Sequence, residues 1–296
     1  MINHYPQFSK LDVSHRNEIR EITTRFEPYS DFNFTSLFAW NTNEDTTISI
    51  LNENLVICMP DYITGKPIYS ILGKNKIEES INTLLIDIPE LSLVPKIVID
   101  NISHKQKYEI TEERDHFDYI YKVSEHAALP GGRYRGKRKR IGKFMNNSLD
   151  QLSLRKIRFN EVSDKILVKR LFDEWVFERN RTIEEADSER EALNRLIENA
   201  THFDLMGIFV YIDDLCVGYS INEVLPNSFA ICHFQKAKLK YEYIDIFLSS
   251  LAAKELYHYG CKYINWEQDL GINGLRILKE SYLPEFYLKK YKLKLN

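Results

Sequence analysis

The feature that most constrains the fold is the segment from Tyr263 to Tyr291, YINWEQDLGINGLRILKESYLPEFYLKKY. Its pattern predicts a buried strand up to Trp266 and a polar turn at Gly271. A short helix then begins at Ile272, and Pro284 ends it before a last strand. Ligands of α/β proteins bind where polar groups follow a strand beside a helix N-terminus. The segment therefore predicts a candidate site.

Two interpretations of its polar residues stay open. Glu267 and Asp269 stand in the turn, and Arg276 and Lys279 follow at a spacing that lets them reach these acids. In the simpler interpretation the acids cap the next helix and Arg276 pairs with them. In the functional one, Glu267 or Asp269 is catalytic and takes a proton, while Arg276 or Lys279 binds a carboxylate or phosphate of the substrate.

Length and charge limit the classes of function. A chain of 296 residues is long enough for two domains, and its formal net charge of −3 excludes a general polycation, so any affinity for nucleic acid must come from a local patch. The N-terminus, MINHYPQFSKLD, lacks the pattern of a signal peptide, and no apolar run has the length of about 18 residues that spans a bilayer. We expect a cytoplasmic protein that at most touches a membrane peripherally.

The four cysteines do not form a close pair. Cys58, Cys216, Cys232 and Cys261 all lie in or beside apolar runs, which favours free thiols in a core. Zinc and thioredoxin-like sites need a close pair, so we expect no metal site.

A dense polar and aromatic segment marks the first predicted domain, residues 1–126. This segment, EPYSDFNFTSLFAWN, covers residues 27–41. It is either an aromatic helix packed on a sheet, or a cleft wall in which Asn33, Thr35 and Trp40 bind substrate. Hairpin strands, a helix with apolar residues at helical spacing from Ile77 to Ile86, and further strands follow, among them one predicted at Val94 to Ile99.

A basic linker helix, residues 127–148, is predicted next. Between positions 133 and 143 it carries seven cations and no acid: Arg133, Arg135, Lys137, Arg138, Lys139, Arg140 and Lys143. Uncompensated like charges repel one another, so an anionic partner explains the run: tRNA phosphates, a phospholipid surface or the phosphates of coenzyme A. The alternative is a solvated helix paired with acids elsewhere in the fold.

The second predicted domain, residues 149–296, repeats the order of helix, antiparallel strands, helix and strand. Its helices are predicted at 164–179, 188–199 and 243–259, and its strands at 152–159, 205–212, 215–221, 228–236 and 263–266. The element order resembles the GCN5-related N-acetyltransferase (GNAT-like) fold. The predicted fold class is therefore α+β, with two tandem GNAT-like domains, each a mainly antiparallel sheet flanked by helices.

Four segments make the chain resemble a bacterial family of uncharacterised proteins grouped with the C-terminal catalytic domain of phosphatidylglycerol lysyltransferase. They are SDFNFTSLFAWN, RYRGKRKRIGKF, HFQKA and NWEQDLGINGLRILKESYLP. Fem-type aminoacyltransferases are similar. The resemblance implies an acyl or aminoacyl transferase that moves an aminoacyl group from aminoacyl-tRNA to an amine or hydroxyl acceptor, which is a small molecule, a lipid or a peptide, without metal.

The HFQKA segment contains two further candidate site residues. His233 is a candidate catalytic base, with a hydrogen-bonded core histidine as the alternative, and Gln235 is a candidate substrate-binding residue. No cofactor is certain. Acyl-CoA is the weaker donor, because KAKLKYEYID, residues 236–245, lacks the glycines that hold a pyrophosphate before the central helix. The other functions left open are a non-catalytic sensor of an anionic ligand (tRNA, nucleotide or lipid) and an acyl-CoA N-acyltransferase.

Overall fold

The computed structural model describes residues 1–148 and 151–296, and its contacts divide the chain into two compact units. The first unit contains residues 1–120 and 267–296, and the second contains residues 121–266. Both units combine helices with antiparallel strands. The division differs from the predicted boundaries at 126/127 and 148/149, because the C-terminal segment returns to the first unit.

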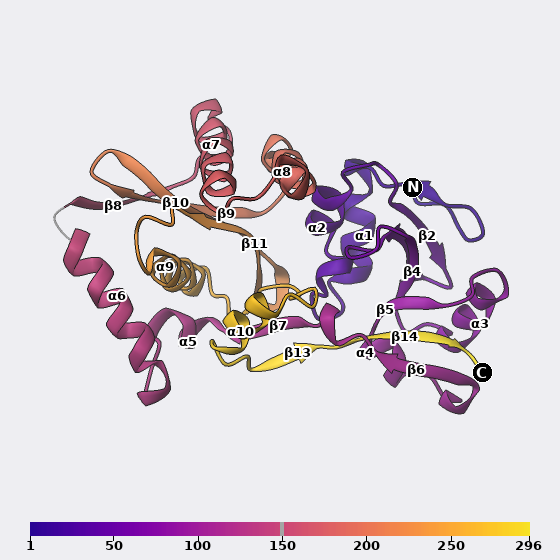
Figure 1. Ribbon diagram of the computed structural model, residues 1–296. Coiled ribbons are helices and arrows are strands. Elements are labelled where there is room, and N and C mark those ends of the chain that lie inside the picture. Colours follow the sequence, from indigo (N-terminus) through magenta and orange to yellow (C-terminus); the bar gives the residue numbers. More distant parts are fainter. Residues whose placement is uncertain (149–150) are drawn as a thin grey trace. The chain divides into compact units, whose positions relative to one another are not determined.

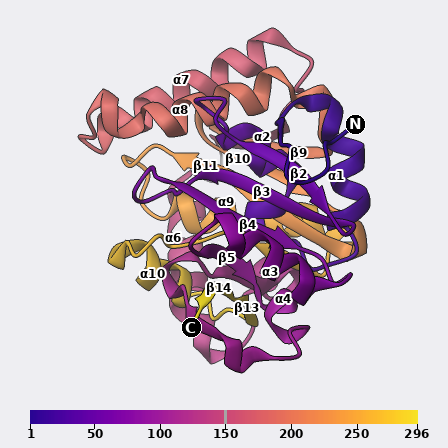
Figure 2. The same ribbon diagram turned by 90° about the vertical axis from the view of Figure 1, so that its right-hand side faces the viewer.

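The first unit is built on antiparallel sheets (Figure 2). A four-stranded sheet has the order β1-β2-β3-β4, and a three-stranded sheet has the order β5-β14-β6. The bounds are β1 Ser9–Lys10, β2 Thr47–Leu51, β3 Asn54–Pro60, β4 Pro67–Leu72, β5 Leu91–Pro95, β6 Tyr108–Glu112 and β14 Lys290–Leu295. Near them β13, Phe286–Leu288, pairs antiparallel with β7, Asp118–Lys122. Because the last strand of the chain is central in β5-β14-β6, the C-terminal segment is part of this unit's core.

The helices of the first unit cover these sheets. They are α1 Arg16–Thr23, α2 Phe34–Trp40, α3 Ile77–Asp87, α4 Lys96–Asp100 and α10 Asn273–Glu280. The predicted helix from Ile77 is confirmed, and its Ile81 and Leu84 are buried in the core. The strand predicted at Val94 to Ile99 is partly wrong: it ends at Pro95, and α4 follows. Its β-branched residues suggest a strand, but Val98 and Ile99 are buried as one face of a helical turn.

The second unit has one sheet among its described strands, in the order β12-β11-β10-β9-β8. The bounds are β8 Leu152–Lys156, β9 Leu205–Ile212, β10 Leu215–Val224, β11 Phe229–Ala237 and β12 Tyr263–Asn265. Neighbours are antiparallel except β11 and β12, which are parallel. The predicted hairpin between β9 and β10 is confirmed, with Asp213 in the left-handed region at its turn.

Helices lie on both faces of this sheet, with α7 and α8 on one side and α9 on the other (Figure 1). The bounds are α5 Val123–Ala128, α6 Arg135–Ser148, α7 Val162–Glu178, α8 Ile183–Glu198 and α9 Ile244–His258. The basic run thus lies on a helix from Arg135 onward, as predicted, but the predicted helix 127–148 is divided, because α5 ends at Ala128 and Arg133 lies in a 3-10 turn, Gly132–Tyr134. Helix α5, which precedes it, was not predicted. Within residues 1–148 and 151–296, we find no helix whose length and hydropathy suit a membrane crossing.

Candidate functional site

The candidate site is the 267–271 loop, which joins β12 to α10. Glu267, Leu270 and Gly271 all have left-handed backbone angles, with φ of 55°, 51° and 73°. Neighbouring backbone fixes the loop, because Leu270 N donates to Asp115 O (2.9 Å) and Tyr119 N donates to Glu267 O (3.2 Å). A Cβ atom at position 271 would lie 3.0 Å from a carboxylate oxygen of Asp115, so only glycine fits this turn without a shift.

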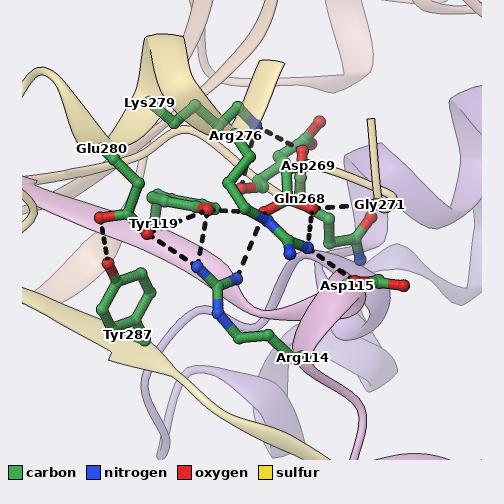
Figure 3. Close-up of polar contacts among 11 residues, drawn as sticks. Arg114, Asp115, Tyr119, Gln268, Asp269, Gly271, Arg276, Lys279, Glu280 and Tyr287 are labelled. Carbon is green, nitrogen blue, oxygen red and sulfur yellow. Dashed lines mark hydrogen bonds and ion pairs between the residues drawn. The ribbon is translucent and has the colours of Figure 1, made fainter. Parts of the chain in front are cut away.

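Asp269, within the loop, anchors it and is fully buried (Figure 3). Its carboxylate accepts hydrogen bonds from Arg276 Nε (2.9 Å) and Nη2 (2.7 Å), Arg114 Nη1 (3.2 Å), the Tyr119 hydroxyl (2.5 Å) and Gly271 N (2.9 Å). Burial would raise the pKa of Asp269, but the hydrogen bonds from Arg276 and Tyr119 outweigh it and lower the pKa to about 2. A carboxylate with this many donors is a weak base, so the geometry favours an anchoring role over proton transfer.

A ring of exposed acids and aromatic side chains surrounds the two arginines (Figure 3). Arg276 Nη2 also donates to Asp115 Oδ1 (2.6 Å), and Arg114 Nη2 donates to Glu280 Oε1 (2.8 Å). The Tyr287 hydroxyl donates to the other oxygen of Glu280 (2.8 Å), and its ring centre lies 5.1 Å from the Arg114 guanidinium. Both arginine heads are therefore held in fixed orientations.

Lys279 supports the same loop from α10. Its side chain is buried, and Nζ donates to the carbonyl oxygens of Glu267 (3.1 Å) and Gln268. Arg276 lies one turn earlier on α10. The predicted pairing of Arg276 with an acid of the turn is confirmed, and both cations predicted to bind substrate make internal contacts with the loop.

Glu267 itself is held by the polar and aromatic segment. The Ser36 hydroxyl donates to Glu267 Oε1 (3.2 Å), and Ser36 N donates to the Asn33 side chain that caps α2 (2.8 Å). The Glu267 side chain is half-buried. Asn33 thus orients the helix that positions the serine, while Thr35 is buried and Trp40 stacks edge-on with Tyr62 at 6.5 Å.

A second buried cluster lies next to Gln268. The Gln268 amide donates to Asp31 Oδ1 (2.7 Å), and Asp31 forms an ion pair with Lys290. Lys290 Nζ also donates to Asp118 Oδ1 (2.9 Å), and Asp118 accepts from Ser30 N (2.8 Å) and Oγ (2.7 Å). The three charged side chains are fully buried. Burial raises the pKa of Asp31 although Lys290 opposes the shift, because two carboxylates share one ammonium group.

The remaining predicted residues lie in the second unit. His233 is buried and its Nε2 is 3.3 Å from Glu223 Oε2, also buried. The Gln235 amide donates to the Ser249 hydroxyl of α9 (3.0 Å). The first unit therefore brings Glu267, Asp269, Arg276 and Lys279 together, whereas His233 and Gln235 make contacts of their own.

Sequence reasoning missed Arg114 and Tyr119, which contact Asp269, and Glu280, which contacts Arg114. It also missed Asp118 and Lys290 of the second buried cluster. Lys290 alone among the four lysines of KKYKLKL is fully buried, and the alternation of the sequence does not distinguish it from the other three. Within the described residues, the His, Cys, Asp and Glu side chains form no group that could hold a metal ion.

One family model matches most of the chain, and solved structures share its fold. The family model described as "Phosphatidylglycerol lysyltransferase, C-terminal" matches residues 23–294. A solved structure of a conserved protein of unknown function from Bacteroides thetaiotaomicron is similar, with 24% identity, full coverage of both chains and a TM-score of 0.85. L-PGS from Bacillus licheniformis is 11% identical (100% of this chain, 94% of that chain, TM-score 0.63), and FemX is 6% identical (97% and 96%, TM-score 0.57). These likenesses show a shared fold. No curated protein matches the chain.

Proposed function

The chain belongs to the phosphatidylglycerol lysyltransferase C-terminal family, and from this premise we propose that it transfers an aminoacyl group from aminoacyl-tRNA to an amine or hydroxyl acceptor. The observation that carries the proposal is the geometry of Glu267, a half-buried carboxylate on a loop clamped by Asp269 and Lys279. Such a loop holds one acid in a fixed place, and the Ser36 hydroxyl contacts its carboxylate.

The proposed transfer reaction needs few further groups from the protein. The acceptor nitrogen or oxygen attacks the ester carbonyl of the aminoacyl group, a new C–N or C–O bond forms, and the bond to the ribose oxygen breaks. In this proposal Glu267 takes the proton from the acceptor and returns it to the leaving ribose oxygen, so no proton is gained or lost overall. The Ser36 hydroxyl, 3.2 Å from Oε1, orients the carboxylate. Positioning contributes the rest of the rate.

The anchoring residues act through Glu267. Asp269 fixes Arg276 and the Gly271 turn, and Lys279 fixes the two carbonyl groups that flank the Glu267–Gln268 peptide. We assign these residues positioning roles, and Arg114 and Tyr119 join them. His233, in a buried pair with Glu223, is assigned to the core of the second unit rather than to proton transfer.

Two features of the second unit support this choice of donor. Residues 236–245, before α9, contain no glycine, so the backbone cradle for a coenzyme A pyrophosphate is lacking there. The basic helix α6 offers a surface for a polyanion instead. We further propose that the two units are tandem GNAT-like domains, which the strand, two helices, three antiparallel strands, helix and parallel strand of the second unit support.

The test measures transfer and donor binding separately. Purified protein is given a mixed pool of radiolabelled aminoacyl-tRNA, with membrane lipids, a peptide mixture or small amines as acceptors, and label is followed into each acceptor fraction. We expect wild-type transfer into one fraction, and a fall of roughly 100-fold or more in E267Q with tRNA retention on a filter unchanged.

Two controls interpret the result. E285Q removes an exposed acid near the loop in sequence and should leave transfer unchanged. Acetyl-CoA added as competitor should not displace the tRNA. Transfer that survives in E267Q, or displacement by acetyl-CoA, would refute the proposal; retention without any transfer would leave a sensor of tRNA in its place.

A further inference from the structure

Six of the seven cations of the basic run divide into two sets, and the first set serves the protein's own fold. The seventh, Arg140, lies over the Tyr243 ring, 5.7 Å from its centre. Arg133 pairs with Glu125, and Arg138 Nη1 donates to the carbonyl oxygens of Leu129 and Gly131 (2.7 Å to the latter). Lys137 is half-buried, and burial, together with the nearby Arg140, lowers its pKa. These cations fix the start of α6.

The second set faces solvent. Arg135, Lys139 and Lys143 follow one another at four-residue steps, so they form a stripe along one side of α6 with about 6 Å between successive positions. Arg135 and Lys139 are exposed and have no ion-pair partner among the described residues. Lys143 pairs with Glu242 at 2.8 Å, but both side chains are more than half exposed, so this pair is weak.

Two glycines flank the stripe. In helical projection Gly136 and Gly142 lie about 60° to either side of it. A Cβ atom at either position would meet nothing within 4 Å, so the packing of the chain does not require glycine there. Glycine inside a helix is unfavourable compared with alanine. Their presence leaves helix backbone bare on both sides of the cations.

The composition of this face selects among polyanions. The aromatic side chain of the helix, Phe144, is buried and packs on Phe247 of α9 with ring centres 5.0 Å apart. Ile141 and Met145 are half-buried. Helices that lie on lipid surfaces expose large apolar residues beside their cations, and this face presents cations, glycines and Asn146 instead. Its charge and shape suit phosphates of a nucleic acid.

We propose that the face formed by Arg135, Lys139, Lys143, Gly136 and Gly142 binds the phosphate backbone of a nucleic acid, with the glycines admitting phosphates close to the helix. The inference rests on the proposed function only for the identity of the nucleic acid, tRNA. Arg133, Lys137 and Arg138, which the sequence grouped with the others, belong to the structural set.

The experiment uses the full chain and a pool of deacylated tRNA, so it does not depend on catalysis. R135Q/K139Q should raise Kd by about 10-fold or more at low salt and should reduce the slope of log Kd against log salt by about 1.4 to 1.8, because each lost phosphate contact contributes about 0.7 in a single strand and about 0.9 in a duplex. The matched control, K165Q/K169Q, removes two cations that contact Glu198 on another helix of the same unit and should change Kd less than about twofold.

Substitution of the two glycines should change stability and tRNA binding in opposite directions. G136A/G142A should raise Tm, because alanine favours the helix, and should weaken tRNA binding by about tenfold as the methyl groups hold phosphates off. An unchanged Kd in this variant would refute the role of the glycines.

Equal effects of R135Q/K139Q and K165Q/K169Q on tRNA binding would refute the proposed surface. The surface would also be refuted if R135Q/K139Q lost binding to phosphatidylglycerol vesicles while its tRNA binding stayed intact. If R135Q/K139Q and G136A/G142A weaken tRNA binding as expected but transfer survives in E267Q, the proposed catalysis is refuted and this inference stands.

Discussion

The buried carboxylates of two clusters in the first unit differ in the number of cations that contact them. Around Asp269, two arginines share one fully buried carboxylate, whereas Asp31 and Asp118 share the single ammonium group of Lys290. The pKa shifts of these carboxylates differ as well. The pKa of Asp269 is lowered to about 2, whereas burial raises that of Asp31. Hydrogen bonds from Arg276, Tyr119 and Gly271 N keep the first carboxylate ionised, whereas burial, with Asp118 nearby, favours a proton on the second.

Solvent access separates the clusters further. The Arg114 and Arg276 side chains are 35% and 32% exposed, so the Asp269 cluster opens to solvent beside the Glu267 loop. All charges of the Lys290 cluster are enclosed. The difference indicates that the first cluster orients a surface loop, while the second joins the C-terminal strand to the N-terminal segment.

The largest expected effect comes from Lys290. K290M leaves two enclosed carboxylates without their ammonium partner, and removal of one member of a buried charge group costs about 3 to 5 kcal/mol of unfolding free energy. Urea denaturation at neutral pH measures this loss. K289M, next along the chain, removes an exposed lysine that pairs with Glu112 and should cost less than about 0.5 kcal/mol. Similar losses of unfolding free energy in K290M and K289M would show that the enclosed cluster contributes no more to stability than an exposed ion pair.

The Asp269 cluster should respond less, because its arginines reach water. D269N is expected to cost about 3 kcal/mol at neutral pH. The folded-state pKa of Asp269 lies below its ordinary value near 4, so the stability from its ionised form is present above about pH 4 and is lost as pH falls toward 2. Wild type should therefore lose stability over this window more steeply than D269N.

The control for this pH dependence is D115N, which removes the exposed acid that also contacts Arg276. It should follow wild type below pH 4. Parallel curves for wild type and D269N would place the acid sensitivity elsewhere in the chain.

Local patterns in the sequence predicted most of the elements and half of the site. Helical spacing found α3 and α9, and the strand, turn and helix at 263–280 were recognised because their polar turn interrupts an apolar run. Arg276 lies seven positions after Asp269, so its pairing could be predicted from helix geometry.

The other half of the site depends on long-range contacts. Arg114 is 155 positions from Asp269, and Lys290 is 172 from Asp118, and no local period relates such residues. Long-range contacts also explain why the predicted domain boundaries differ from the two units. The pairing of β14 between β5 and β6 returns the C-terminal segment to the first unit. The division of the basic cations into two sets could not be predicted either, because it depends on the carbonyl groups that Arg138 contacts.

The smallest effect expected is that of D31N, and it sharpens the comparison most. Asparagine keeps one oxygen, which can still face Lys290, loses the hydrogen bond from Gln268 to the other oxygen and leaves one carboxylate for one ammonium, so the cost at neutral pH should stay near about 1 kcal/mol. The folded-state pKa of Asp31 is raised, so wild type loses stability as pH rises above the ordinary value of about 4, and D31N lacks this loss. The free-energy difference between wild type and D31N should therefore shift in favour of D31N between acid and neutral pH. A shift in favour of wild type would mean that Asp31 is ionised as readily as Asp269, and that the two clusters do not differ in the way their contacts require.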